Sequence, residues 1–383
     1  MNEILALHKN EYAVSPEVVA VAPGSVNLMG SHTDYNSGYV IKSTIDRWVT
    51  IGVSKRKDNS LRFYAADLDE RKRTTITNLK YKREDRWANY PKGALFELYK
   101  LGYVFKGIDI TITGNIPQKI GLSSSAAIEV AVLLAVKKLY SLDINDMQLI
   151  KCAAVAESSF MGTGSEITDQ LVSFVSKRGN VIFLDSRTQE YSYIPFKFDE
   201  IKFLVTNSNV PHGDIANELS ERRNECKECV SLLNKKKKGT ALRDYSVYDL
   251  QHSMGIVPEN LRRICKHVVE ENQRTLEAKE ALLVSDLVTY GKLLNRSHES
   301  LRDQYEVSCP EIDWLVKRSW ELDCVLGSRL TGSGFGGCTI TLIKKDEMEQ
   351  YIEKLEEYER IFGFECDYFF CEPTERARVI YPE

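Results

Sequence analysis

Hydrophobic positions along the chain follow two different spacings. Short runs of alternating or β-branched apolar residues predict strands, and longer stretches with apolar residues three and four positions apart predict helices. The predicted strands are Val18–Val21, Val49–Val53, Ile108–Thr113, Val181–Leu184, Ile201–Thr206 and Thr339–Ile343. The predicted helices are Ala126–Leu139, Asp146–Phe160, Ile215–Leu233, Glu259–Leu283, Asp286–Ser300 and Glu347–Ile361. This is an α+β pattern, because strands and helices do not alternate regularly.

The length of the chain predicts two lobes with a cleft between them. A chain of 383 residues is longer than one hydrophobic core usually supports. The polar stretch Tyr193–Glu200, which contains Pro195, separates two strand-like runs and is the best boundary. We therefore expect an N-terminal lobe of residues 1–195 and a C-terminal lobe of residues 196–383.

Composition and charge exclude several classes of partner. The formal net charge is -4, which provides no field that would attract nucleic acid or an anionic membrane. The N-terminus lacks the basic start and apolar stretch of a secretory signal. No uncharged apolar run reaches the roughly 18 residues of a membrane-spanning helix. We expect a cytoplasmic protein with neither nucleic-acid nor membrane partners.

The nine cysteines point to the same compartment, because an odd number in a long chain without a signal peptide is typical of reduced thiols. Cys226 and Cys229 form one CxxC in a helical stretch, without a second ligand pair. Two reduced helical thiols are the better interpretation, and zinc or redox chemistry is the weaker one.

The segment Gly114–Ala127 is the first candidate for chemistry. It follows a predicted strand, contains Gly121 and three consecutive serines, and leads into a predicted helix. Unpaired N–H groups and the helix dipole make such a helix start a site for phosphate. A helix entry capped by serine is the alternative.

The segment Gly327–Leu342 is the second candidate, and its Gly332, Gly334 and Gly337 spell GxGxxG. A dinucleotide-binding loop would have to follow a strand and open a helix, whereas this one runs into the predicted strand Thr339–Ile343. A glycine loop beside the nucleotide fits better. A plain turn between strands is the alternative.

Two further segments carry polar side chains on turn-rich stretches. Ala22–Gly38 places His32 and Asp34 where they could hold sugar hydroxyls, although Asp34 could equally form an Asx turn. Glu157 and Asp169 lie twelve residues apart across a break that contains glycine. One could hold a metal and the other meet a substrate, whereas isolated carboxylates are usually surface charges.

Taken together and in order, these four segments resemble galactokinases of the GHMP kinase family, over residues from about 20 to the C-terminus. The resemblance implies a two-lobed GHMP-kinase fold, with a ribosomal protein S5 domain 2-like N-terminal lobe and a ferredoxin-like C-terminal lobe. It also implies ATP and Mg²⁺ as cofactors and a small sugar as the partner. Catalysis would then consist of positioning and charge neutralisation around the transferred phosphoryl group.

The resemblance also assigns roles to individual residues. Asp169 resembles the catalytic base, and Ser125 and Glu157 resemble the Mg²⁺ ligands. The residues that match ATP-binding positions are Trp87, Tyr90, Lys119, Gly121, Leu122, Ser123, Ser124, Ser125 and Ala126. The residues at sugar-binding positions are Ser25, Ser31, His32, Asp34 and Glu166.

Several positions depart from the family pattern. Ser25 stands where an arginine normally pairs with the catalytic aspartate, so we expect the pKa of Asp169 to be raised and transition-state stabilisation to be lost. Ser31 replaces a glutamate that grips the sugar, and Glu166 replaces a glycine. Leu219 replaces a tyrosine that contacts the sugar, and Lys119 replaces a glycine of the ATP loop.

The predicted function is that of a monomeric ATP-dependent sugar 1-kinase, which phosphorylates the anomeric hydroxyl of galactose or a close relative. The altered sugar-side positions leave a kinase for another sugar, such as galacturonate, as an alternative. The missing arginine leaves a non-catalytic sugar or ATP sensor as a second alternative. A nicotinamide-dependent oxidoreductase rests on the GxGxxG match alone.

Overall fold

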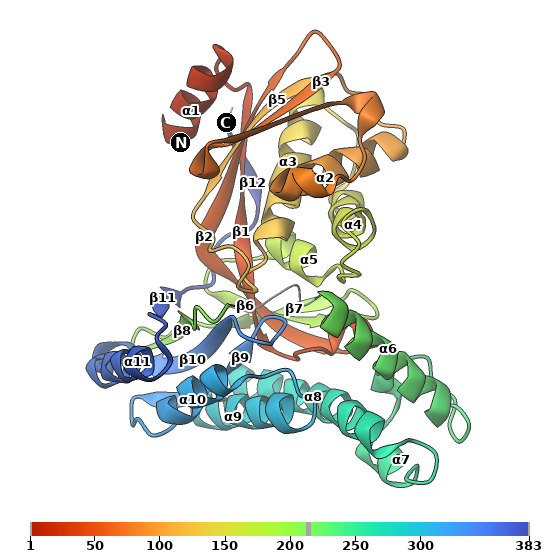
Figure 1. Cartoon of the computed structure of the whole chain (residues 1–383), viewed down its shortest axis with the longest axis vertical. Coiled ribbons are helices and arrows are strands. Elements are labelled where there is room, and N and C mark those ends of the chain that lie inside the picture. The colour runs from red at the N-terminus through yellow and green to blue at the C-terminus, as the bar shows by residue number, and fades with distance from the viewer. Residues whose placement is uncertain (1, 212–215, 382–383) are drawn as a thin grey trace.

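The computed structural model describes residues 2–211 and 216–381, which form two antiparallel-rich sheets with helices packed on them (Figure 1). In this part of the chain the first sheet has eight strands, and its main path runs in the order β12-β1-β2-β5-β3-β4. β6 pairs with the other end of β2, and β7 pairs with β6. The strands are β1 (Val18–Met29), β2 (Tyr39–Lys55), β3 (Ser60–Ala65), β4 (Glu70–Thr75), β5 (Ile108–Gly114), β6 (Asn180–Asp185), β7 (Tyr191–Pro195) and β12 (Arg378–Tyr381).

Four helices cover one face of this sheet, and α1 (Asn2–Tyr12) lies on the other side of it (Figure 1). The four are α2 (Asn89–Lys100), α3 (Ser124–Tyr140), α4 (Asp146–Val155) and α5 (Thr168–Val175). α3 packs against β1 and β2 and is buried almost all round. Its apolar side chains therefore anchor the preceding candidate phosphate-binding segment, called here the phosphate loop and running from Gly114 to the start of α3, to the core of the first sheet.

The second sheet is antiparallel and has the strand order β11-β8-β10-β9. Its strands are β8 (Ile201–Asn207), β9 (Val325–Thr331), β10 (Cys338–Lys344) and β11 (Asp367–Cys371). α9 packs on β9 and also against α8. The helices of this half are α6 (Ala216–Leu233), α7 (Val247–Gln251), α8 (Glu259–Leu283), α9 (Leu287–Asp303), α10 (Pro310–Ser319) and α11 (Glu349–Phe362).

The predicted strands all lie within observed strands, and the predicted helices match α3, α4, α6, α8, α9 and α11 with small shifts at their ends. Ile215, the first residue of one predicted helix, lies outside the described residues. The hydrophobic pattern missed short or polar elements such as β4, whose sequence is ERKRTT and whose strand state comes from pairing with β3. β12 returns from the end of the chain to pair with β1, so both halves of the sequence contribute to the first sheet.

One prediction about the cysteines is wrong. Cys229 on α6 and Cys265 on α8 form a disulfide, because the packing of these two helices places their Cα atoms 6.5 Å apart. Cys226, the other half of the CxxC, is a buried free thiol. The two CxxC cysteines therefore point to different partners and do not form a metal or redox pair with each other.

Across residues 2–211 and 216–381, no helix combines the length and apolar character that crossing a lipid bilayer requires.

Candidate active site

A cleft of about 1120 Å³ brings the four candidate segments together. The phosphate-loop segment enters it from β5 and ends at Ser123, whose backbone is left-handed with φ 55°, directly before the first residue of α3. The first N–H groups of α3, which have no partner within the helix, therefore lie where Gly121–Ser125 line the cleft. Ser123, Ser124 and Ser125 all line the cleft.

The two glycine-rich loops touch each other through their backbones. A Cβ added to Gly121 would lie 2.7 Å from the Cα of Gly332, and Gly121 and Gly332 both have positive φ, at 80° and 85°. Only glycine combines this backbone conformation with so close an approach. Gly332–Gly337 leads into β10 and not into a helix, which excludes the dinucleotide-binding interpretation.

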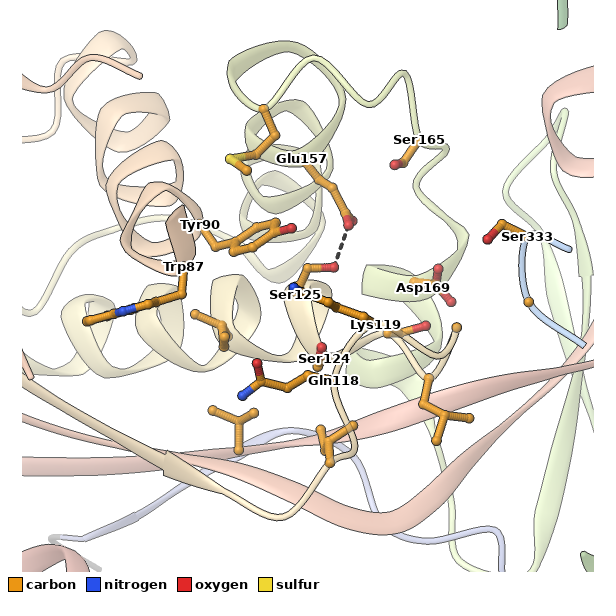
Figure 2. Close-up of a pocket in the computed structure, with 18 of the residues that line it drawn as sticks. Trp87, Tyr90, Gln118, Lys119, Ser124, Ser125, Glu157, Ser165, Asp169 and Ser333 are labelled. Atoms are coloured by element: carbon orange, nitrogen blue, oxygen red, sulfur yellow. Dashed lines mark hydrogen bonds between the residues drawn. The ribbon is translucent and has the colours of Figure 1, made fainter. Parts of the chain in front are cut away.

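Glu157 stands over the start of α3, on a π-helical turn of residues Ala156–Phe160. Its carboxylate accepts a hydrogen bond from Ser125 Oγ at 2.5 Å (Figure 2) and another from Gln170 Nε2 at 2.5 Å. Burial raises the pKa of Glu157, and the nearby charge of Asp169 raises it further. A cation bound here would offset both effects, since it favours the ionised carboxylate.

Asp169 lies in the first turn of α5 and also lines the cleft (Figure 2). Its Oδ1 accepts hydrogen bonds from Ser25 Oγ at 2.8 Å and from Lys42 Nζ at 2.7 Å. Burial opposes ionisation, but the charge of Lys42 and hydrogen bonds from Lys42, Ser123 and Ser25 outweigh it and lower the pKa of Asp169. The expectation of a raised pKa is therefore wrong, because Lys42 supplies the positive charge that is absent at Ser25.

Trp87 and Tyr90 form the far wall of the cleft, beside the beginning of α2 (Figure 2). Trp87 donates its Nε1–H to the carboxylate of Glu70 at 2.7 Å, which orients the indole ring. Burial raises the pKa of Tyr90 to about 12, so its hydroxyl stays protonated. The wall therefore presents two aromatic side chains, which is the kind of surface on which a planar base packs.

The opposite end of the cleft holds His32 and Asp34. His32 Nδ1 lies 2.9 Å from the hydroxyl of Tyr35, whereas its buried Nε2 has no hydrogen-bond partner. Burial and neighbouring positive charges lower the pKa of His32 to about 3, so the ring is neutral. Buried polar atoms are normally paired, so an unpartnered Nε2 on a residue that lines the cleft marks His32 as a candidate ligand contact.

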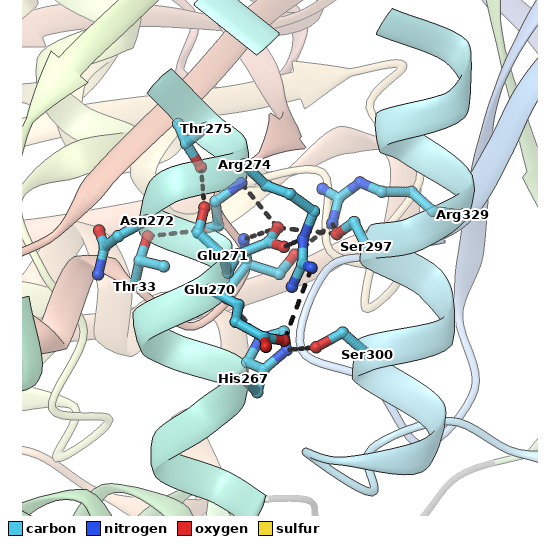
Figure 3. Close-up of polar contacts among 12 residues, drawn as sticks. Thr33, His267, Glu270, Glu271, Asn272, Arg274, Thr275, Ser297, Ser300 and Arg329 are labelled. Atoms are coloured by element: carbon cyan, nitrogen blue, oxygen red, sulfur yellow. Dashed lines mark hydrogen bonds and ion pairs between the residues drawn. The ribbon is translucent and has the colours of Figure 1, made fainter. Parts of the chain in front are cut away.

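Ser31 lines the cleft, but its hydroxyl already accepts a hydrogen bond from another residue of the protein. Arg329, fully buried on β9, donates to Ser31 Oγ at 2.6 Å and to the side chain of Asn27 at 2.8 Å. Behind it, Glu271 on α8 accepts from Ser297 Oγ and from Arg274 (Figure 3). Glu271 also accepts from the N–H of Ser31 at 3.3 Å. This network fixes the end of β1 and shapes the cleft from beneath.

Glu166 and Leu219 both line the cleft, together with Arg223. Burial and the charge of Asp34 raise the pKa of Glu166, because together they outweigh the opposing charge of Arg223.

Ser25 and Ala126 are the two predicted site residues that do not belong to the cleft wall. Ser25 lies beneath Asp169, and Ala126 is buried on the core side of α3.

Sequence reasoning missed several residues that line the cleft, namely Lys42, Asn27, Tyr35, Arg223 and Ser333. Lys42 carried a weak signal, because it is a lysine at the start of a strand with apolar neighbours. Arg223 lies on α6, where nothing in the helical spacing distinguishes it from other charged residues.

The comparisons with known proteins agree with this arrangement. The family descriptions that match are the galactokinase galactose-binding signature over residues 6–55, the GHMP kinases N terminal domain over 89–177 and the GHMP kinases C terminal over 278–360. The chain thus has the fold of a GHMP kinase, a class that uses ATP. It belongs to the galactokinase family within that class.

Full-length relatives support the assignment. The chain is 37% identical to a galactokinase of Ligilactobacillus salivarius, with 95% of both chains covered, and 35% identical to one of Bacillus subtilis, with 94% covered. A crystal structure of Lactococcus lactis galactokinase complexed with galactose superposes with a TM-score of 0.93 at 29% identity, over 98% of both chains. The predicted family and GHMP-kinase fold are therefore confirmed.

Proposed function

We propose that this protein transfers the γ-phosphoryl group of ATP to the anomeric hydroxyl of galactose. The observation that carries the proposal is the position of Asp169, an ionised carboxylate held between the phosphate loop and the end of the cleft that contains His32 and Asp34. The likeness over almost the whole chain to a galactokinase complexed with galactose supports the same acceptor.

The residues divide the reaction between them. Asp169 accepts the proton of the anomeric hydroxyl, whose oxygen forms a bond to the γ-phosphorus while the bond from that phosphorus to the β–γ bridging oxygen breaks. ADP leaves with the bridging oxygen. The N–H groups of Gly121–Ser125 stabilise the phosphate charge, and Trp87 and Tyr90 hold the adenine. His32 and Asp34 position the sugar.

Ser125 and Glu157 are suited to hold Mg²⁺. They present hard oxygen atoms 2.5 Å apart at the cleft wall, and Glu157 is a buried carboxylate with a raised pKa. Mg²⁺ commonly takes only one or two protein oxygens and completes its shell with phosphates and water. When bound, it would neutralise charge on the β- and γ-phosphates.

The two alternative functions are less well supported by the site. A uronic acid would bring a carboxylate toward Asp34 and Glu166, which both line the sugar end, while Ser31 is engaged by Arg329. A non-catalytic sensor would not need Lys42 beside Asp169, because that pair keeps the base ionised. We therefore place galactose phosphorylation first.

A panel of acceptors with Mg-ATP tests the proposal. Galactose, galactosamine, galacturonate and glucose are offered separately, and ADP release and sugar 1-phosphate are measured. We expect galactose to give the highest kcat/KM. Asp169→Asn should lower kcat by roughly a thousandfold, because it removes the base, while ATP binding measured by calorimetry is retained. Faster turnover of galacturonate, or ATP binding without any product, would contradict the proposal.

A further inference from the structure

Lys42 occupies an unusual place for a lysine. It lies on β2 with only 7% of its side chain exposed, directly opposite Asn27 of β1. A buried lysine is costly unless its charge is paired. Its partner is Asp169, at 2.7 Å, and the same lysine also lines the cleft beside the phosphate loop.

Ser25 and Lys42 converge on one oxygen from neighbouring strands. Ser25 pairs with Thr44 across the β1–β2 ladder, and Asn27 pairs with Lys42, so Ser25 and Lys42 are diagonal neighbours on the same face of the sheet. Both donate to Asp169 Oδ1, at 2.8 and 2.7 Å. The short side chain of Ser25 leaves room for the ammonium group of Lys42.

One cation and two further carboxylates determine the charge around the pair of Lys42 and Asp169. Lys42 is the cation in contact, while Glu157 from the π-helical turn and Asp34 from the loop after β1 are nearby carboxylates. Burial disfavours the charged form of Lys42, but Asp169, Asp34 and Glu157 outweigh this effect and raise its pKa. Lys42 is therefore a cation between three carboxylates. It is the cation in direct contact with Asp169, at 2.7 Å.

We propose that Lys42 is the positioning residue of the catalytic base, because its ammonium group holds Asp169 ionised and turned toward the acceptor hydroxyl. The required positive charge thus comes from β2, and Ser25 on β1 provides the space for it. This inference rests on the proposed function, since it assigns Asp169 as the base.

An ion pair that only stabilised the fold would give different results from a positioning pair. A structural pair would change the stability of the protein and leave the chemistry of Asp169 unchanged. A positioning pair would change the pKa of Asp169 and the rate of transfer. The decisive measurements are therefore kinetic and spectroscopic.

The test compares variants that remove, keep or move the charge. Lys42→Met should lower kcat roughly a hundredfold, with the KM for ATP changed less than about threefold. Lys42→Arg should recover most of the rate, because it keeps a charged donor. Ser25→Arg combined with Lys42→Ala moves the cation to the neighbouring strand and should be at least about tenfold faster than Lys42→Met, whereas Ser25→Arg alone crowds two cations and should be slow.

Arg56→Met is the matched control, because Arg56 pairs with the largely buried Asp109 in the same lobe but outside the cleft. Its kcat should equal that of the wild type. If Lys42→Met does not fold, the rate of the double variant decides, since recovery of activity requires only a cation near Asp169. A wild-type rate in Lys42→Met, or no recovery in either charge-retaining variant, would overturn the proposal.

A second measurement does not depend on the acceptor. The carboxyl carbon of Asp169 is titrated by ¹³C NMR, with Asp169→Asn to identify its signal. Lys42→Met should move the titration midpoint upward by about 1 to 3 pH units, because an adjacent positive charge has been removed. An unchanged midpoint would overturn the proposal. Failure of the wild type to phosphorylate any sugar would instead contradict the proposed function.

Discussion

Asp169 and Glu157 are carboxylates of one cleft whose surroundings move their pKa values in opposite directions. Burial disfavours the charge on each of them. At Asp169, Lys42 and two serines outweigh burial and lower the pKa, whereas at Glu157 burial and the charge of Asp169 raise it. Such a separation assigns different tasks to two groups of the same chemical type. Asp169 is suited to accept a proton, and Glu157 to receive a cation.

The first prediction at this scale concerns Glu157. Glu157→Gln should raise the Mg²⁺ concentration needed for half-maximal activity by about 10- to 100-fold, because an amide oxygen is a weaker ligand than a carboxylate. The measurement is a Mg²⁺ titration of the transfer rate at saturating galactose and ATP.

Glu129→Gln is the control for that titration. Glu129 is fully buried close to Gln170, and burial and the charge of Glu157 hold its pKa well above the ordinary value. A protonated carboxyl and an amide are close in shape, so this variant should keep the Mg²⁺ requirement of the wild type. Equal Mg²⁺ requirements in the Glu157 and Glu129 variants would exclude Glu157 as a ligand.

At the scale of elements, the site depends on contacts between segments far apart in the chain. The loop before α3 and the loop between β9 and β10 meet at Gly121 and Gly332. The network of Glu271, Arg274 and Arg329 joins α8 and β9 to the end of β1 (Figure 3). The second sheet and its helices therefore hold the phosphate loop and the end of β1 in fixed positions relative to each other.

Gly121→Ala tests the contact between the two loops. The new Cβ would lie 2.7 Å from the Cα of Gly332. Because the atom that it meets is a backbone atom and not the end of a flexible side chain, one of the two loops must shift. We expect the Kd for ATP to rise at least about tenfold, as measured by calorimetry, because the phosphate-binding N–H groups move with the loop.

Gly363→Ala separates the clash from simple backbone strain. Gly363 ends α11 with φ 76°, and a Cβ there meets nothing within 4 Å. It should lower the free energy of unfolding by about 1 kcal/mol through its left-handed conformation and leave the Kd for ATP unchanged. Similar Kd values in the Gly121 and Gly363 variants would show that the contact between the loops does not matter for binding.

At the scale of the whole molecule, three buried histidines tie stability to pH. Burial is the main cause in each case, and it lowers the pKa of His8 to about 4, of His32 to about 3 and of His267 to about 4. The ordinary value is 6.5, so the unfolded chain binds these protons more readily than the folded one. Their contribution to stability is complete above pH 6.5 and is lost as the pH falls below it.

The predicted result is marked acid lability. Between pH 7.5 and pH 5, each of the three should reduce the free energy of unfolding by about 2 kcal/mol, measured from guanidinium unfolding curves. His8→Gln should make this loss smaller, whereas His252→Gln should not, because His252 is exposed. A free energy of unfolding that is the same at both pH values would contradict the prediction.

The sequence by itself determined the long elements and predicted which segments form the ATP half of the cleft. Those signals are local: the apolar spacing of α3 and α8, and glycine and serine residues within a few positions of a helix start. The association of the four segments came from the family resemblance, which also carried the roles of Asp169 and Glu157. The roles predicted for the sugar-side residues came from the same resemblance.

Only the tertiary structure decided how the missing positive charge is replaced. Lys42 and Asp169 are separated by 127 positions, and they meet because β2 lies beneath α5 and because Ser25 on the adjacent strand is small. The partner of Ser31 is likewise an arginine from β9, 298 positions away. Electrostatics acts through space, so the pattern of neighbouring residues cannot reveal which distant charge stands beside Asp169.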